Sequence, residues 1–442
     1  MTVVNKKEPL ILGLVDIILL ALSLIGTLIL RYHSLPSKEM VLSHLYPFSI
    51  IFIYSIVSFY ILGLYGRAMS NARHTLPFRI IKAQIANALI AVAIFYFIPN
   101  FTVSPKITLL LYIILSSVFI LFVRINTYSI LNLRKKQPGL IIGDSVEVDE
   151  IVEEMNRNPH SQLYCKSKIS PESGEDSISK ALSDKTYFRY VIADVDDSRV
   201  EKFLPEIYKN LFPNSSIIDL HDLYEDIFDR IPLSRINYTW IMTHISSISP
   251  KVYDAVKRLT DIVLSSIVLI FALILYPFVA IAIKIEDGGS ILIKQKRIGV
   301  NNKIFNIYKF RSMTRSDNGQ WLPENENKVT KVGKFIRKTR IDELPQAISV
   351  IRGDMSLIGP RADIIDLGER LQKEIPYYSI RTVIKPGLSG WAQVNQEKPP
   401  QSVEETKIRL SYDLYYIKYR SLSLDLLITL RTIKTLLSRE GM

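Results

Sequence analysis

The chain has 442 residues, 48% of them hydrophobic, and still carries a formal net charge of +12. With a mean hydropathy of +0.17, this composition is typical of a protein that lives at a membrane and faces anionic lipids or phosphorylated substrates. Nucleic acid is disfavoured as the partner, because the sequence has no zinc-finger spacing and no basic zipper. The only cysteine, Cys165, excludes an internal disulfide framework.

The first third of the chain predicts a four-helix transmembrane bundle. Each of four apolar runs is about long enough to cross roughly 30 Å of hydrocarbon. The runs cover residues 11–30, 45–64, 80–98 and 107–123. Lys and Arg gather in alternate flanks, so the positive-inside rule places both ends of the bundle in the cytoplasm. Asp16, inside the first run, is interpreted as structural rather than as part of a transport path.

Residues 138–250 predict a soluble, Rossmann-like α/β domain. Buried parallel strands are expected within residues 139–145, 190–195 and 216–220, separated by helices such as 200–211. A dinucleotide site would need a glycine-rich turn after the first strand. Only Gly143 is present there, so a structural or assembly role is favoured over cofactor binding.

A fifth apolar run, residues 262–283, contains no charge and is interrupted by Pro277. Its two flanks are equally basic, so neither end favours translocation. Proline removes a backbone hydrogen bond and clashes with the preceding turn. The sequence therefore favours a re-entrant helix-break-helix that returns to the cytoplasmic face, with a plain fifth span as the alternative.

The stretch "TRIDELPQ", residues 339–346, sets Asp342 and Glu343 side by side after a basic run. One interpretation is an ordinary helix start, with Asp342 as the N-cap, Pro345 in the first turn and Gly353 ending the helix. The other is an active site.

The residue types of the last 190 or so positions restrict the chemistry. There is no histidine after His244 and no cysteine after Cys165, which excludes Ser-His-Asp and Cys-His mechanisms and Cys/His zinc sites there. Among carboxylate, hydroxyl and lysine nucleophiles, the carboxylate alone needs no base at pH 7, since the reference pKa of Asp is about 3.9.

Several cations near the Asp-Glu pair predict a phosphate cradle, because Arg forks bind oxygen atoms bidentately. They are Lys296, Arg297, Lys309, Arg311, Arg340, Arg352 and Arg361. For any one of these residues taken alone, the alternative is a solvated surface charge. Two adjacent carboxylates among them suit Mg²⁺ shared with a substrate diphosphate, so Asp342 and Glu343 are also the predicted metal ligands.

The segment "KPGLSGWAQVN", residues 385–395, is the third predicted element of the site. Its substrate-binding candidates are Lys385, Trp391, Gln393 and Asn395, which could form a rigid wall for a sugar or base. A buried core tryptophan is the alternative for Trp391. Residues 421–439 have leucines at helical spacing with interspersed cations, which predicts an interfacial helix; packing on the catalytic domain is the alternative.

From about residue 250 to 442 the chain resembles the bacterial sugar transferases, the monotopic phosphoglycosyl transferases. The shared motifs, in order, are "KRLTDIVLSSIVLIFALILYPFVAIAIK", "QKRIG", "YKFRSM", "RIDELPQ", "GDMSLIGPR", "KPGLSGWAQVN" and "YDLYYI". The four spans and the middle domain are similar to the large, polyprenyl glycosylphosphotransferase branch. Two motifs depart from the family pattern: the loop after the fifth run reads "EDGGSIL", and "GPRP" is replaced by "GPRA" at residues 359–362.

The resemblance implies an undecaprenyl-phosphate sugar phosphotransferase. Asp342 would attack the β-phosphate of a UDP-sugar and release UMP, and polyprenyl (undecaprenyl) phosphate would then take the sugar phosphate from the enzyme. Glu343 would assist with Mg²⁺. The implied setting is the bacterial inner (cytoplasmic) membrane, with the catalytic domain on the cytoplasmic face of the bilayer, at the first membrane step of an exopolysaccharide, capsule or O-antigen pathway. A homodimer built partly through the middle domain is also implied.

The sequence thus predicts three parts: a transmembrane domain at 1–137, a degenerate Rossmann-like domain at 138–250, and a re-entrant helix with an α/β catalytic domain at 251–442. The sugar stays open among UDP-glucose, UDP-galactose and N-acetylated sugars. A membrane-anchored scaffold that binds a nucleotide without turnover is the alternative from another class. A metal-dependent glycosyltransferase that releases UDP is the alternative among enzymes.

Overall fold

The computed structural model describes most of the chain, and contacts divide it into two compact units, Met1–Ile227 and Phe228–Met442. The residues outside the description are 1–7, 63, 66–75, 98–105, 132–135, 159–162, 174–187, 196, 206–215, 246–250, 314–328, 397 and 439–442.

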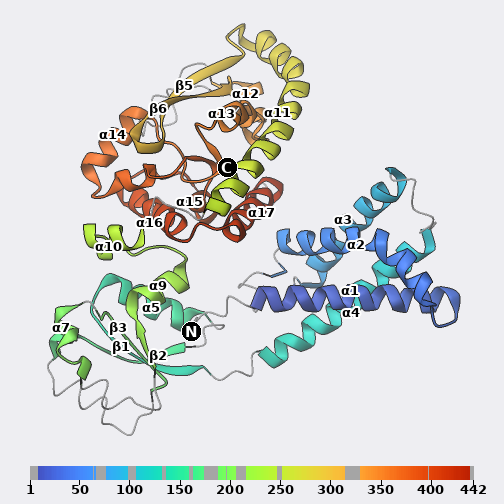
Figure 1. Cartoon of the computed structure of the whole chain (residues 1–442), viewed down its shortest axis with the longest axis horizontal. Coiled ribbons are helices and arrows are strands. Elements are labelled where there is room, and N and C mark those ends of the chain that lie inside the picture. Colours follow the sequence, from blue (N-terminus) through green and yellow to red (C-terminus); the bar gives the residue numbers. More distant parts are fainter. Residues whose placement is uncertain are drawn as a thin grey trace. The chain divides into compact units, whose positions relative to one another are not determined.

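The first unit begins with a helical bundle (Figure 1). Its helices are α1 (Glu8–Tyr32), α2 (Lys38–Ile61), α3 (Leu76–Phe97) and α4 (Lys106–Leu131). Their buried side chains form one apolar core that includes Leu20, Phe59, Ile80 and Tyr112. Large apolar side chains also cover the outside of the bundle. A bundle that is apolar on both its inner and outer surfaces fits a lipid environment.

Asp16 is buried between helices of the bundle, and its role there is structural. Its Oδ2 atom lies 2.6 Å from Nη2 of Arg124 on α4 and accepts a hydrogen bond of 2.7 Å from the Tyr65 hydroxyl. Both side chains of the ion pair are 2% exposed. A buried carboxylate in apolar surroundings requires such partners.

Helix α3 carries polar side chains that bond the neighbouring helices of the bundle. Within the described residues, the helices apolar and long enough to cross a membrane are Ile11–Tyr32, Lys38–Ile61, Ile107–Arg124 and Val252–Glu286. The predicted third span is not tested in this way, because the side chains of α3 are described only for residues 79–95. Within that stretch, Asn87 accepts a hydrogen bond from Ser58 at 2.7 Å, and Gln84 donates one to Ser116 at 3.0 Å.

The rest of the first unit is a four-stranded, fully parallel sheet in the order β2-β1-β3-β4. The elements are β1 (Gln137–Ile142), α5 (Val146–Arg157), β2 (Leu163–Ile169), η2 (Pro171–Ser173), β3 (Tyr190–Ala193), α7 (Ser198–Glu201), β4 (Ser216–Asp219) and α9 (Leu220–Phe228). The three predicted strands are confirmed and β2 is additional. Most of the predicted helix at 200–211 lies outside the described residues.

The carboxyl edge of this sheet, where a dinucleotide would bind in a Rossmann fold, is occupied by ion pairs. Arg199 contacts Asp144 at 3.2 Å, Asp197 at 2.8 Å and Glu172 at 3.4 Å. Because these three carboxylates neutralise the charge of Arg199, its side chain is less suited to binding a pyrophosphate.

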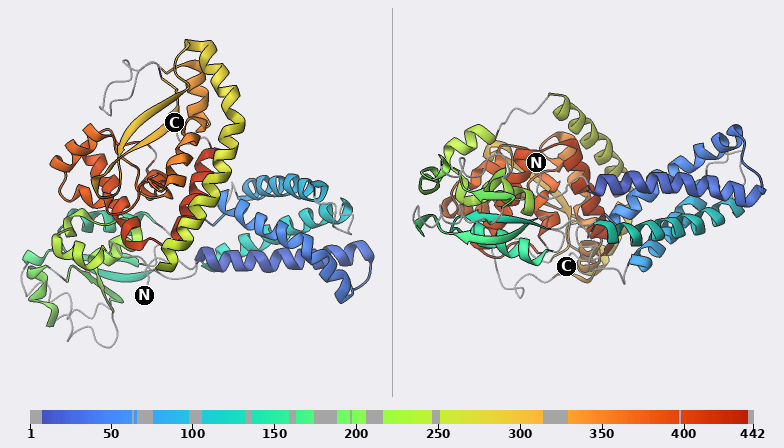
Figure 2. Two further views of the ribbon diagram at one scale, coloured as in Figure 1. Left: turned by 45° about the horizontal axis from the view of Figure 1, so that its top comes forward. Right: turned by 90° about the horizontal axis from the view of Figure 1, so that it is seen from below.

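The second unit packs helices around short strands (Figure 2). Its elements are η3 (Leu233–Arg235), α10 (Tyr238–His244), α11 (Lys251–Asp287), β5 (Leu292–Ile298), η4 (Val300–Asn302), β6 (Ile304–Phe310), α12 (Lys331–Lys338), η5 (Ile341–Gln346), α13 (Ala347–Arg352), β7 (Ser356–Ile358), α14 (Ile365–Glu374), η6 (Tyr378–Thr382), β8 (Gly387–Ser389), α15 (Trp391–Asn395), α16 (Val403–Tyr419) and α17 (Leu422–Ser438). Strands β5 and β6 form an antiparallel hairpin, and β7 pairs with β8 in parallel.

The main core of this unit includes residues that precede the predicted domain start at 251. Ile231, Ile236 and Trp240 belong to the same buried cluster as Trp391 and Leu414. The Trp391 indole donates a 2.8 Å hydrogen bond to the carbonyl of Asp229. The chain just before α11 is therefore an integral part of the second unit.

Helix α11 is continuous from Lys251 to Asp287 with Pro277 inside it, so the predicted break of the helix at this proline is wrong. It runs along one side of the second unit (Figure 2). Near its start, the Arg258 guanidinium donates to the carbonyls of Val350 and Ile351, each at 2.7 Å. Near its end, Val279 and Ile283 pack into a cluster on the same unit. Both halves of the apolar helix thus contact one compact domain.

Candidate active site

The Asp-Glu pair lies in η5, a short 3₁₀-helix that precedes α13. Arg340 occupies the N-cap position in the left-handed region at φ 55°, and no side chain accepts a capping hydrogen bond there. The interpretation of Asp342 as the N-cap is therefore wrong, since Asp342 lies in the first turn. Gly353, at φ 92°, ends α13 as expected, because that conformation favours glycine.

Glu343 is held by cations from three different elements. Its Oε1 atom accepts a 2.8 Å hydrogen bond from Nη2 of Arg361 and lies 3.6 Å from Nζ of Lys309 and 3.8 Å from Nη1 of Arg340. Burial alone would raise the pKa of Glu343, but these charges together hold it well below its usual range. Glu343 is therefore an anion fixed in orientation.

Asp342 differs from its neighbour in making no ion pair with any described residue, whereas Glu343 makes three. Its side chain is buried, at 8% exposure, and Oδ1 has no hydrogen-bond partner among the described residues. Burial and the adjacent charge of Glu343 raise the pKa of Asp342 to about 6, against the opposing effects of Lys309, Arg337 and Arg340. The carboxylate is still the major form at pH 7, and its Oδ1 atom is not committed to another described residue.

Lys309, on β6, is the buried cation of the site. Burial lowers its pKa to about 8, while the charge of Glu343 opposes the shift. The cluster of Asp342, Glu343, Lys309, Arg340 and Arg361 thus joins β6, η5 and the loop after β7. An acidic pair surrounded by cations can bind a polyanion and present one carboxylate oxygen to it.

The hairpin separates the remaining predicted cations. Arg297 lies on the same face as Lys309, since side chains alternate along a strand. Its guanidinium donates to the Ala362 carbonyl at 3.2 Å. Lys296 is on the opposite face and exposed, and the exposed Arg352 lies 5.7 Å from the ring centre of Tyr308, on that same opposite face.

The remaining candidate cations are engaged elsewhere. Arg311 donates from Nε to the Met313 carbonyl, and a side chain on Gly289 would overlap its guanidinium. The Lys385 ammonium lies beside the left-handed Gly353. Their substrate-binding role stays a prediction.

The segment 385–395 is packed more deeply than a substrate wall requires. Trp391 is 1% exposed, stacks on Tyr415 and carries the Arg431 guanidinium 4.6 Å from its ring centre. Asn395 accepts a 2.6 Å hydrogen bond from Arg431. These contacts favour the core alternative for Trp391. Gln393 Oε1 is buried without a partner among the described residues.

The sequence reasoning gave no role to a buried network behind Arg361. Arg381 bridges Asp363 and Asp413, and all three side chains are almost fully buried. Asp363 follows the "GPRA" motif and Asp413 lies in "YDLYYI". Their position in these motifs was the available signal, because a charged residue beside buried aromatic residues needs a partner.

No group of three or more His, Cys, Asp or Glu side chains suited to a metal occurs in the part of the chain that the structure describes. A divalent cation at the Asp-Glu pair would thus have two protein carboxylates at most. Mg²⁺ accepts this arrangement when substrate phosphates and water complete its six oxygen ligands. The free Oδ1 atom of Asp342 fits such a cation.

Comparison with known proteins identifies the class of this domain. Residues 252–439 match the family described as bacterial sugar transferase. An uncharacterized sugar transferase of Bacillus subtilis is 35% identical over 42% of this chain and 89% of its own length. The chain therefore belongs to the bacterial sugar transferase family.

Relatives with named activities include two undecaprenyl-phosphate transferases. A UDP-N-acetylgalactosamine-undecaprenyl-phosphate N-acetylgalactosaminephosphotransferase of Aeromonas hydrophila is 36% identical over 57% of this chain and 59% of its own length. A UDP-glucose:undecaprenyl-phosphate glucose-1-phosphate transferase of Klebsiella pneumoniae is 39% identical over 40% and 39%, respectively. The chain thus spans less than two thirds of the length of these relatives.

Proposed function

We propose that this protein transfers a sugar 1-phosphate from a UDP-sugar to polyprenyl phosphate and releases UMP. The observation that carries the proposal is the contrast within the Asp-Glu pair. Glu343 is fixed by three cations, whereas the carboxylate of the buried Asp342 makes no ion pair with a described residue and its Oδ1 atom has no hydrogen-bond partner there. A nucleophile needs such a free oxygen, and a neighbouring fixed anion suits the binding of a metal-diphosphate substrate.

In the first step, a carboxylate oxygen of Asp342 forms a bond to the β-phosphorus of the UDP-sugar. The bond from that phosphorus to the bridging oxygen breaks, and UMP leaves with the oxygen and its electron pair. In the second step, an oxygen of polyprenyl phosphate bonds to the same phosphorus, and the Asp342 carboxylate leaves. The products are UMP and a polyprenyl diphosphate sugar.

The cations have separable roles in this scheme. Lys309, Arg340 and Arg361 would bind phosphate oxygens and balance the charge that develops during transfer. Mg²⁺, held by Asp342 and Glu343 together with the substrate diphosphate, would neutralise the leaving UMP. Burial keeps water from competing with polyprenyl phosphate for the enzyme-bound phosphoryl group.

The packing of α11 supports a catalytic domain that stays on one side of the bilayer. Arg258 and Ile283 both contact the second unit, although roughly 38 Å of helix separates them at about 1.5 Å per residue. A perpendicular span would put these two contacts on opposite sides of roughly 30 Å of hydrocarbon. We therefore propose a re-entrant path, with the cytoplasmic face of the bacterial inner membrane as the location of the domain.

Helix α17 presents a second apolar surface. Leu424, Leu427 and Ile428 pack on the core of the unit, whereas Leu422, Leu426, Ile433 and Leu436 are exposed and follow one face of the helix. The packed face agrees with the alternative from the sequence, packing on the catalytic domain. We propose that the exposed face of α17 rests in the membrane interface. We also propose that the protein forms a homodimer, as the family resemblance implies.

The topology is tested with tags at residue 1, near residue 145 and at residue 442. A membrane-impermeant reagent applied to intact cells should label none of them, and lysis should expose all three. Labelling of the C-terminal tag in intact cells would contradict the re-entrant path.

The activity is tested with membranes that contain the protein and a panel of UDP-glucose, UDP-galactose and their N-acetylated forms. One UDP-sugar should give UMP in a burst equal to the amount of enzyme, and polyprenyl phosphate should convert the burst to turnover. Asp354→Asn, which alters an exposed aspartate of the same segment, is the matched control for Asp342→Asn. Release of UDP would instead indicate a metal-dependent glycosyltransferase, and binding without a nucleotide product would indicate a scaffold.

A further inference from the structure

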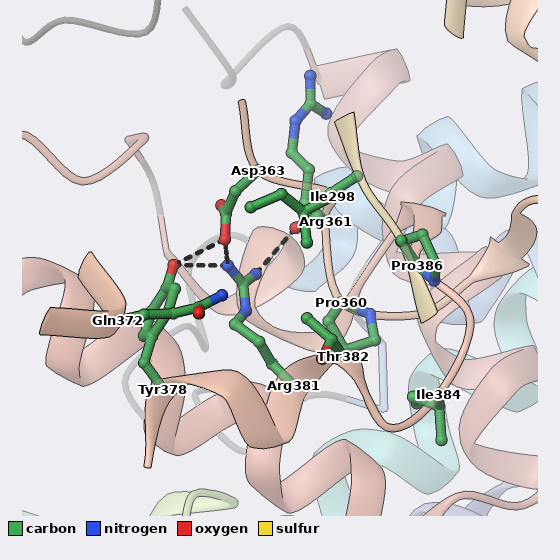
Figure 3. A pocket seen from close by; sticks show the side chains of 12 residues that line it. Ile298, Pro360, Arg361, Asp363, Gln372, Tyr378, Arg381, Thr382, Ile384 and Pro386 are labelled. Carbon is green, nitrogen blue, oxygen red and sulfur yellow. Dashed lines mark hydrogen bonds and ion pairs between the residues drawn. The ribbon is translucent and has the colours of Figure 1, made fainter. Parts of the chain in front are cut away.

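Arg361, whose side chain binds Glu343, is itself held in place through its backbone. Arg361 donates from its side chain to Glu343, and its backbone carbonyl accepts hydrogen bonds from Nη2 of Arg381 at 2.9 Å and from Nη2 of Arg409 at 3.2 Å. One residue therefore connects the Asp-Glu pair to two guanidinium groups in the interior. Figure 3 shows the Arg361 side chain extending away from Arg381, while a dashed line joins its backbone to the Arg381 guanidinium.

The Arg381 guanidinium has no freedom to rotate away from this carbonyl. Nε lies 3.1 Å from Oδ2 of Asp413, and Nη2 lies 2.8 Å from the same oxygen. Nη1 donates to Asp363 and lies 2.6 Å from the Tyr378 hydroxyl. The side chain is also buried, at 4% exposure for the residue. Because the planar guanidinium group is held by these partners, it also fixes the position of the Arg361 carbonyl that accepts its remaining hydrogen bond.

The loop that carries Arg361 is also attached on both sides. The amide of Gly359 donates to the Ser389 carbonyl and the amide of Gly387 donates to the Pro360 carbonyl, each at 2.9 Å. On the other side, the Ile298 amide donates to the Asp363 carbonyl at 3.0 Å. Backbone hydrogen bonds thus hold the loop in place. The Arg361 carbonyl is the atom through which the buried guanidinium groups of Arg381 and Arg409 contact the loop.

The network is balanced in charge. Two carboxylates, Asp363 and Asp413, face two guanidinium groups, those of Arg381 and Arg409, with Arg409 3.9 Å from Asp363. Replacing such a cluster by apolar residues is often neutral or stabilising in other proteins, so burial of these charges is poorly explained by stability alone. Orientation of a functional group is a use that apolar residues could not fulfil.

We propose that Arg381 is a positioning residue for the transferase reaction: through the Arg361 carbonyl it aligns the Arg361 side chain on Glu343 and thereby orients the acidic pair. Arg381 touches neither substrate nor the reacting oxygen of Asp342. The proposal rests on the proposed function for its kinetic consequence, but the alignment of Arg361 on Glu343 is a property of the fold that is measurable without turnover.

The kinetic test is a double-mutant cycle of Arg381→Lys and Arg361→Ala, measured as UMP release at saturating UDP-sugar. Lysine keeps the charge but cannot contact Asp363, Asp413 and the Arg361 carbonyl at once. We expect Arg381→Lys to lower kcat at least tenfold, with KM for the UDP-sugar changed less than threefold. Added to Arg361→Ala, it should cause less than a further twofold loss, because its route of action is already removed.

The matched control is Asp425→Asn, which breaks another partly buried ion pair of the same unit, the 3.0 Å contact with Lys257. Its effect should multiply with that of Arg361→Ala. If the losses from Arg381→Lys and Arg361→Ala also multiply, Arg381 acts only on the general stability of the domain, and the proposal is refuted. Arg409→Lys, which alters the second and more exposed donor to the same carbonyl, replaces Arg381→Lys if that variant does not fold.

A second cycle needs no enzymatic activity. Thermal midpoints of Arg361→Ala, Glu343→Gln and the double variant report the coupling between the two side chains. We expect a coupling in the otherwise unmodified protein and its loss in the Arg381→Lys background; an unchanged coupling overturns the proposal. A protein that gives no UMP from any UDP-sugar refutes the proposed function, and this thermal cycle then decides the positioning role by itself.

Discussion

The pH dependence of the first half-reaction should depend on Glu343 in a defined direction. The protonated form of Asp342 cannot attack phosphorus, so UMP release should rise with pH through the pKa of Asp342, which is raised to about 6. After burial, the charge of Glu343 is the largest cause of that rise. Glu343→Gln removes this charge and should move the acidic limb of the profile to lower pH.

The magnitude follows from the pKa. With a pKa of about 6, Asp342 is about nine-tenths ionised at pH 7 and about one-tenth at pH 5, so the rate should fall roughly tenfold between them. If Glu343→Gln lowers the pKa by about one unit, the same pH change should reduce the rate only about twofold. The absolute rate of the variant should be lower, because Arg361, Lys309 and Arg340 lose the anion that fixes them.

The assay is single-turnover release of UMP from pH 4.5 to 7.5 at constant ionic strength and Mg²⁺ concentration. Arg370→Gln, which breaks the exposed pair with Glu374, is the control and should leave the limb in place. A limb for Glu343→Gln that stays at the original pH, or moves upward, would refute the electrostatic coupling of the pair. Raising the Mg²⁺ concentration should move the limb of the unmodified protein downward if Asp342 binds the metal, since a cation favours the ionised form.

Three further outcomes are expected. Asp342→Asn should abolish the UMP burst and the retention of labelled sugar phosphate on the enzyme while the thermal midpoint stays near that of the unmodified protein; a folded variant that still traps label would exclude Asp342 as the nucleophile. A fragment that starts at residue 228 should unfold at a higher temperature than one that starts at 251, because 228–245 fills the core around Trp391; equal midpoints would contradict this. Asp16→Leu should destabilise the bundle by about 3 kcal/mol by leaving Arg124 unpaired, and Asp16→Leu with Arg124→Leu should recover most of that loss in a reversible unfolding assay; a double variant as unstable as the single one would argue against the pair.

The middle domain shows where local sequence stops being informative. The strands β1, β3 and β4 read as apolar runs and were found from the sequence. Strand β2 has the mixed sequence "LYCKSKI" and lies at the edge of the sheet. An edge strand is half exposed, so its residues need not be apolar, and the pairing with β1 that defines it is not encoded locally.

The sequence by itself determined the helices of the bundle, the candidate dyad and the end of α13 at Gly353, because length, adjacency and glycine preference are local properties of a chain. Tertiary structure alone decided which cations reach Glu343: Lys309 lies 34 positions before it and Arg361 lies 18 positions after it, while Lys296 is turned away by the alternation of β5. It also decided that Asp342 is buried with a raised pKa, since desolvation depends on every element packed around a group. The burial of Trp391 and the pairing of Asp363, Arg381 and Asp413 were likewise not predictable from the sequence. Their partners lie far apart along the chain and come into contact only when the core forms.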